Sequence, residues 1–148
     1  MMSSYPHVSF YFSVSFNGIG KSSIDTQFQS VGGLSVEMQT ENVAEGGENR
    51  FEHILPVRSK YSDLVLKRGL FTDSELIHWC FDAFESTIIK PVSLNISMLN
   101  EEGTPLFSWH VVHAWPKKWS VSDLNAEQNA LAIETFELNY RYFRTLKT

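Results

Sequence analysis

Several short groups of residues in this chain are of types that can carry out chemistry. Gly20-Lys21-Ser22 matches the end of a phosphate-binding loop. The complete pattern requires a glycine five positions before Gly20, where this chain has Ser15, and a helix after the serine. Strand-like residues follow instead, so a hairpin turn is the simpler interpretation.

His110 and His113 have the spacing of a metal-binding pair on a helix. On a strand, however, residues three apart point to opposite faces of the sheet, and the two rings would diverge. The neighbouring Trp109, Val111 and Val112 favour a strand. The pair therefore predicts no metal site.

Cys80 and His78 lie close together in the sequence but do not form a nucleophile and base pair. Residues two apart on a helix do not face each other. A reactive thiolate also needs an electropositive environment, which the flanking Trp79 and Phe81 do not supply. We expect Cys80 to be a buried neutral thiol.

The carboxylates do not form an acid and base pair either. Glu101 and Glu102 belong to a turn, and Glu134 and Glu137 are interpreted as solvated positions on a strand. No nucleophile, base and orienting group can be assembled from the chain. The sequence therefore predicts a protein that is not an enzyme and needs no cofactor.

The composition describes one soluble domain covering residues 1–148. Twelve basic and seventeen acidic residues give a net charge of −5, which argues against specific nucleic-acid binding. A single cysteine excludes an internal disulfide. The start of the chain does not have the features of a signal peptide, and the apolar runs are too short for a membrane-spanning segment.

Alternation of apolar and polar residues predicts a mainly β (α+β) fold, a small antiparallel barrel or sandwich. We expect Pro116 to end one strand. In the last predicted strand the apolar residues change from one sheet face to the other, and a bulge near Thr135 would explain the change. A helix over residues 125–136 is the competing interpretation of that final segment. The predicted strands cover about residues 8–16, 23–38, 51–55, 63–67, 92–98, 106–115 and 130–143.

One flanking α-helix is predicted over about residues 73–85. Thr72 and Glu75 have the spacing of a capping box, in which each side chain satisfies a free backbone amide of the first turn. Apolar residues then recur at helical spacing and predict a face that packs on the sheet. The large side chains assigned to the core are Trp79, Phe84 and Trp109.

A polar, glycine-containing segment over about residues 41–50 interrupts the strand pattern. Its flanks alternate as strands, but the segment itself has too little apolar bulk to bury on its own subunit. It is either a flexible hairpin tip or an arm that becomes ordered against another molecule. Its residues are Glu41, Asn42, Val43, Ala44, Glu45, Gly46, Gly47, Glu48, Asn49 and Arg50.

Taken together, the motifs resemble those of the phage tail tube protein family. The resemblance runs through FYFSVSF, FQSVGGLSVEMQTENVAEGG and LVLKRG before a tryptophan-containing helix. It continues through NISMLNEEGTPLFSWHVVHAWPKKW and AIETFELNY. It covers about residues 8–143 in the expected order, and it is most similar to the inner tubes of contractile injection systems.

This resemblance implies a structural protein. Six copies would close into a ring, and rings would stack into a hollow tube that a contracting sheath drives into a target envelope. The implied partners are further copies of the chain, sheath and baseplate proteins, and a cargo or effector in the lumen. Assembly would take place in the bacterial cytoplasm, before the tube becomes part of a phage tail or phage-tail-like particle. The segment 41–50 would then reach over neighbouring subunits.

Polar residues on the predicted strands are candidates for the surface that lines the lumen. Without the family resemblance they fit the solvent face of a monomer equally well. The alternative function is a monomeric β-barrel that binds a small ligand in an aromatic interior. The candidate lumen residues are Ser13, Ser15, Glu37, Gln39, Ser93, Asn95 and Ser97.

Overall fold

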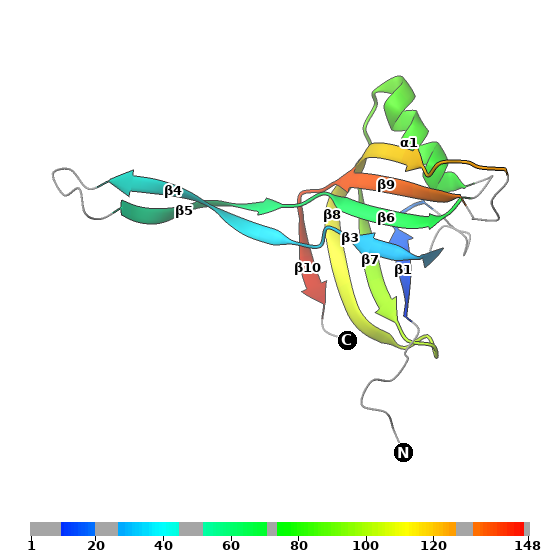
Figure 1. Ribbon diagram of the computed structural model, residues 1–148, viewed down its shortest axis with the longest axis horizontal. Helices are drawn as coiled ribbons and strands as arrows, with labels where there is room; N and C mark the ends of the chain where they lie inside the picture. The colour runs from blue at the N-terminus through cyan, green and yellow to red at the C-terminus, as the bar shows by residue number, and fades with distance from the viewer. Residues whose placement is uncertain (1–9, 20–26, 45–51, 71–73, 127–131, 147–148) are drawn as a thin grey trace, which may run out of the picture.

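The computed structural model describes residues 10–19, 27–44, 52–70, 74–126 and 132–146. These residues form strands and one helix, so the predicted mainly β class is confirmed (Figure 1). In chain order the elements are β1 (Tyr11–Phe16), β2 (Gln27–Phe28), β3 (Ser30–Gly32), β4 (Val36–Ala44), β5 (Glu52–Tyr61), β6 (Leu64–Gly69), α1 (Glu75–Ser86), β7 (Val92–Leu99), β8 (Pro105–Val121), β9 (Ile133–Asn139) and β10 (Tyr142–Leu146).

Two antiparallel layers make up the body. The first layer is β2-β1-β7-β8, with β10 on the other side of β8; the second continues from β8 through β9-β6-β3. In Figure 1 the strands of the first layer lie roughly vertically and cross behind the strands of the second layer, which lie horizontally. Among the described residues the sheet does not close on itself, so the fold is a sandwich rather than a barrel.

Strand β8 belongs to both layers. Its first half pairs with β7 and β10, and its second half pairs with β9. The bend between the halves lies near His113, whose φ is +55°, and a register shift follows between Pro116 and Lys118. The prediction that Pro116 ends the strand is therefore wrong. Pro116 is buried at an irregularity of the ladder, where its missing N–H can be tolerated.

The core lies between the layers. Val14, Leu94, Ile96 and Val111 of the first layer meet Leu64, Leu66, Phe136 and Leu138 of the second, and all are fully buried. These residues alternate along their strands with more exposed ones, as the period of a pleated strand requires.

Helix α1 closes one end of this core. Ser74 is its N-cap and accepts a hydrogen bond from the Ile77 N–H at 3.3 Å. The cap is therefore Ser74 rather than the predicted Thr72, which lies outside the described residues. Leu76, Cys80 and Ala83 are the buried residues of the helix.

Phe84 does not lie in the core, contrary to its sequence assignment. Its side chain is 38% exposed and packs edge-on against Phe81. The buried stripe consists of Leu76, Cys80 and Ala83, at i, i+4 and i+7, and Phe84 lies at its margin. Trp79 and Trp109 are partly buried and pack against the core cluster.

Two other predicted strands are divided differently in the structure. The segment 23–38 contains β2, β3 and the start of β4, with the break at Gly33, whose φ is +86°. The last segment contains β9 and β10, separated at Tyr140 and Arg141 rather than bulged at Thr135. Among the described residues, no helix has the length and apolar character needed to cross a membrane.

Candidate assembly surfaces

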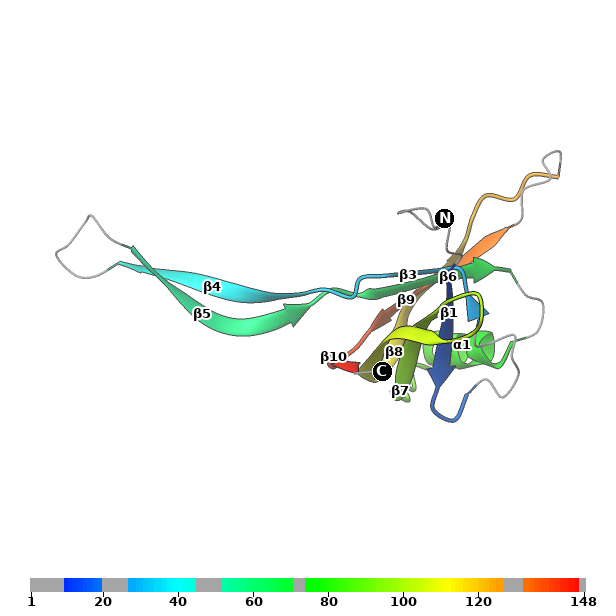
Figure 2. The ribbon, with the colours of Figure 1, turned by 90° about the horizontal axis from the view of Figure 1, so that it is seen from below.

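Strands β4 and β5 form a separate two-stranded sheet that projects from the body as an arm (Figures 1 and 2). Every side chain from Val36 to Val43 and from His53 to Lys60 is exposed. A two-stranded ribbon with no covered face is at best marginally stable by itself in water. A surface of this kind normally exists to contact another molecule.

The predicted polar segment forms the outer part of this arm. Glu41, Asn42, Val43 and Ala44 belong to β4 and are not a loop, because they pair with residues 52–55 of β5. The remaining predicted residues, Glu45 to Arg50, lie outside the described residues. The arm is also longer than expected, since its paired strands extend back to Val36 and Tyr61.

The two faces of the arm differ near the body. Val36 pairs with Tyr61 and Met38 with Ser59 on one face, whereas Glu37 pairs with Lys60 on the other. Met38 is 54% exposed and Ile54, further out on the same face, is 67% exposed. Leu55 and Val43 lie on the opposite face near the tip. We call the face that carries Val36, Met38 and Ile54 the apolar arm face.

Close backbone packing fixes the start of the arm. A Cβ added to Gly33 would lie 1.8 Å from the Asp63 carbonyl oxygen, so only glycine fits there. The Tyr140 hydroxyl donates to the Gly33 carbonyl oxygen at 3.3 Å, and the Ser35 and Ser62 hydroxyls are 2.7 Å apart. The two strands thus leave the body side by side.

Asp63 connects the same region to β8 and β9. Its carboxylate accepts hydrogen bonds from Lys117 Nζ at 2.6 Å and Asn139 Nδ2 at 3.2 Å. The bond from Lys117 is the main cause of the lowered pKa of Asp63, and partial burial opposes it. Above these groups, the Tyr61 ring packs edge-on against Tyr140 and Phe143. Burial raises the pKa of Tyr140 to about 12, so the hydroxyl stays neutral.

One face of the first layer is polar. Ser15 pairs with Asn95, Asn95 with His110 and His110 with Arg144, so these four side chains form a row across the sheet. Asn95 Oδ1 lies 2.7 Å from His110 Nδ1. In the next row, the Ser97 and Ser108 hydroxyls are 3.1 Å apart. This polar sheet face includes the candidate lumen residues Ser13, Ser15, Ser93, Asn95 and Ser97.

Glu37 and Gln39, the other two lumen candidates, are not part of this face. They lie on the arm, opposite Lys60 and Arg58. Their alternation resembled that of the body strands, but the break at Gly33 places them in a different sheet. The structure therefore separates them from the five candidates on the polar sheet face.

A buried polar cluster, absent from the sequence interpretation, lies under the second layer. Arg68 Nε donates to Glu134 Oε2 at 2.7 Å, and Arg68 is 2% and Glu134 0% exposed. Arg68 also donates to the Ser74 hydroxyl at 2.9 Å, and Trp119 Nε1 donates to Glu134 Oε1 at 2.8 Å. The guanidinium lies over the Phe28 and Phe136 rings. The interpretation of Glu134 as solvated was wrong, since the residue is fully buried. Its burial is possible because Arg68 neutralises its charge.

The other groups considered for chemistry do not converge. His110 contacts Asn95 on the polar sheet face, whereas His113 lies at the bend of β8. Burial, and next the Glu134 carboxylate, raise the pKa of the fully buried Cys80 thiol to about 12. The described residues contain no group of three or more His, Cys, Asp or Glu side chains that could hold a metal ion.

The tryptophans do not line one interior cavity. Trp79 donates to the Lys90 carbonyl oxygen, Trp109 stacks on Phe107, and Trp119 packs edge-on against Phe81. Three of the rings thus have separate surroundings, and this gives no support to an aromatic binding site.

Known structures share this fold over nearly the whole chain. A chain of the cryo-EM structure of the anti-feeding prophage (AFP) baseplate, 6-fold symmetrised, has a TM-score of 0.76 and 29% identity, covering 99% of this chain and 97% of that one. A chain of the PVC extracellular contractile injection system, from its sheath-tube complex in the extended state, has a TM-score of 0.74 and 22% identity, with full coverage of both chains (100%). Hcp1 from Flavobacterium johnsoniae has a TM-score of 0.54 and 12% identity, covering 91% and 94%. The last two similarities concern the fold alone.

Sequence comparison assigns the family. No curated protein matches the chain significantly. The family model described as "T4-like virus tail tube protein gp19" matches residues 8–144. The resemblance in the motifs is thus confirmed over almost the whole length. The chain belongs to the T4-like virus tail tube protein gp19 family.

Proposed function

We propose that this tail tube protein is the repeating subunit of the inner tube of a contractile injection particle, with six copies in each ring and rings stacked into a hollow shaft. The observation that carries the proposal is the arm, whose described side chains from Val36 to Val43 and from His53 to Lys60 are exposed. The 29% identical chain from the six-fold symmetrised AFP baseplate supports the number of copies.

Unpaired strand edges offer a way to close the ring. Among the described residues β10 pairs only with β8, and β2 covers β1 only at Phe12 and Ser13. Exposed edges readily accept a further strand. Pairing of β10 in one copy with β1 in the next would join six first layers into one continuous wall.

In that arrangement the polar sheet face would line the lumen. Ser13, Ser15, Ser93, Asn95 and Ser97 would present hydroxyl and amide groups to the interior, which suits the passage of a cargo without tight binding. The role requires no catalytic group. The outer side of the tube would contact sheath and baseplate proteins, and assembly in the bacterial cytoplasm would precede release of the particle.

Shortening the arm tests the proposal. Replacement of residues 38–59 by a short Gly-Ser turn should leave the folded body intact, because none of the described side chains between these positions belongs to the core cluster, whereas Tyr61, which packs against it, is kept. Circular dichroism and thermal melting should change little, whereas tubes should be lost in negative-stain microscopy. Leu124→Ser, at a 73% exposed position outside the arm, is the control that should still assemble. Normal tubes from the shortened variant would contradict the proposed role of the arm.

A further inference from the structure

The two layers of the sandwich differ in extent, and each continues past the other. The second layer is prolonged sideways by the arm, since β3 leads into β4 and β5 leads into β6. The first layer is prolonged downwards in Figure 1, where β1, β7 and β8 extend past the second layer. In the described part of the molecule, the inner face of each extension is therefore not covered by the other layer.

The extended part of the first layer is apolar on its core side. Phe12 pairs with Met98 and Met98 with Phe107, one row beyond the buried Val14 and Ile96. Exposure rises along this direction, from 0% at Ile96 to 53% at Phe107. Phe107 stacks on Trp109 with ring centroids 6.2 Å apart, and Phe10 is 51% exposed. We call the surface of Phe10, Phe12, Met98, Phe107 and Trp109 the overhang.

The apolar arm face is the matching extension of the second layer. It begins at Tyr61, whose ring packs on Tyr140 and Phe143 at the margin of the core. Val36 pairs with Tyr61 and therefore points to the same side, followed by Met38 and Ile54. The apolar arm face is therefore the continuation, outside the body, of the core-facing side of the second layer.

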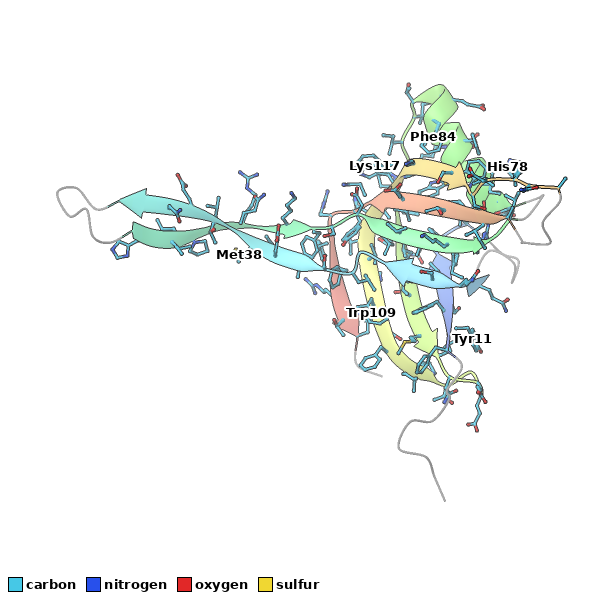
Figure 3. The ribbon with its side chains drawn as sticks, viewed as in Figure 1. Tyr11, Met38, His78, Phe84, Trp109 and Lys117 are labelled. Carbon is cyan, nitrogen blue, oxygen red and sulfur yellow. The ribbon has the colours of Figure 1, made fainter. Side chains whose placement is uncertain are left out.

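One molecule cannot bring these two surfaces together. The arm leaves the body along the longest axis of the molecule, whereas the overhang lies under the body (Figures 1 and 3). In Figure 3 Met38 lies on the arm and Trp109 on the lower half of β8, well apart. The tight packing of Gly33 against Asp63 prevents the start of the arm from folding back freely.

We infer that the apolar arm face of one copy covers the overhang of another, so that the sandwich of each subunit is completed by its neighbour. This inference rests on the proposed tube function and names the receptor surface for the arm. Both surfaces carry large exposed apolar side chains on one strand face, and sheets pack face to face at about 10 Å through such residues. The arm strands, of nine and ten residues, span roughly 30 Å at about 3.3 Å per residue, enough to cross four strands. A contact between two different surfaces of identical chains can close a ring or propagate along a tube.

Cysteine cross-linking between two single variants tests this inference. Met38→Cys and Phe107→Cys proteins are mixed, allowed to assemble and treated with a short bismaleimide. The buried Cys80 should not react while the protein is folded. We expect at least tenfold more mixed dimer than in two controls on the opposite faces of the same strands, Glu37→Cys with Phe107→Cys and Met38→Cys with Ser108→Cys.

The outcomes separate this inference from the proposed function. Tubes that form but give no more Met38–Phe107 product than the controls would overturn the docking and leave the tube function standing. The overhang would then be covered by its own chain or by a different partner. A wild-type protein that remains a monomer under all conditions would overturn both. As a second measurement, Phe107→Asp should fold but fail to assemble into tubes. The control Leu124→Asp should both fold and assemble. Assembly of Phe107→Asp would also overturn the docking.

Discussion

Glu134 shows how a single residue can depart from the pattern of its strand. It occupies an inward position of β9, between the layers, where an apolar side chain is the usual choice. Arg68, Ser74 and Trp119 supply its charge partner and complete the local hydrogen bonds. In a fully buried ion pair of this kind, each charge depends on the other, because loss of one partner leaves the remaining charge buried without compensation.

Removal of one partner should therefore be costly. Glu134→Ala leaves the Arg68 guanidinium buried without its carboxylate, and we expect a loss of about 3–5 kcal/mol in the free energy of unfolding. The measurement is urea denaturation of the soluble subunit. The double variant Arg68→Met with Glu134→Leu should lose much less, because no buried charge remains. Equal losses in the single and double variants would show that packing, not charge, is the reason.

The sequence could not reveal this cluster. Arg68 and Glu134 are 66 positions apart, and each is common on solvated strand faces. Alternation in β9 does place Glu134 in phase with Phe136 and Leu138, which was the available signal. By contrast, Cys80 could be predicted as a buried thiol because its neighbours are apolar, and it is fully buried.

At the scale of elements, the arm depends on the short links that join it to the body. Gly33 adopts a φ of +86° in direct contact with the Asp63 backbone. Lys117 and Asn139 then hold the Asp63 side chain. These contacts determine the direction in which β4 and β5 leave the body.

Gly33→Ala should disturb this junction. The added Cβ would clash with the Asp63 carbonyl, and the positive φ is itself unfavourable for alanine. We expect a loss of at least about 1–3 kcal/mol in thermal or urea unfolding. Gly69→Ala is the matched control, since a Cβ at Gly69 would meet no atom within 4 Å. Equal stability of the two variants would contradict the structure of the junction.

The Asp63–Lys117 pair should make the junction sensitive to extreme pH. The pKa of Asp63 is lowered from 3.8, so its contribution is complete above pH 3.8 and is lost as the pH falls through the lower folded value. The pKa of Lys117 is raised from 10.5, so its contribution is complete below pH 10.5 and is lost as the pH rises through the higher folded value. The stability difference between wild type and Asp63→Asn should therefore be constant at intermediate pH and shrink at both extremes. A difference unchanged at pH 2 would refute this account.

Element prediction succeeded where alternation was strict and failed at the junctions. Strands β1 and β7 appear close to their expected positions, because one of their faces is buried. The arm was recognised as an unusual segment, but its length was underestimated, since alternation alone cannot tell a strand in the body from one in a free ribbon. The bend of β8 at His113 depends on contacts with β9 and β10 that local sequence does not encode.

At the scale of the whole molecule, the main feature is that neither layer of the sandwich is completely covered by the other. A two-layer sandwich normally buries both inner faces. Here the arm and the overhang each extend past the opposite layer, and large apolar side chains such as Ile54 and Phe107 remain more than half exposed at 67% and 53%. A surface of this kind is expected of a subunit that reaches its final state only in an assembly.

The family could be inferred from the sequence because its motifs run through the whole chain in order, and the family model confirms it over residues 8–144. The assembly surfaces could not be inferred in the same way. They arise from the placement of whole layers relative to each other, which depends on the bend in β8 and the break at Gly33.

Negative-stain electron microscopy of the purified wild-type protein tests the central claim most directly. We predict ring-shaped particles with six-fold symmetry, or stacked tubes of constant diameter, at concentrations where light scattering reports a mass of six copies or more. A monomer whose mass does not change with concentration, together with an absence of rings and tubes, would contradict the account.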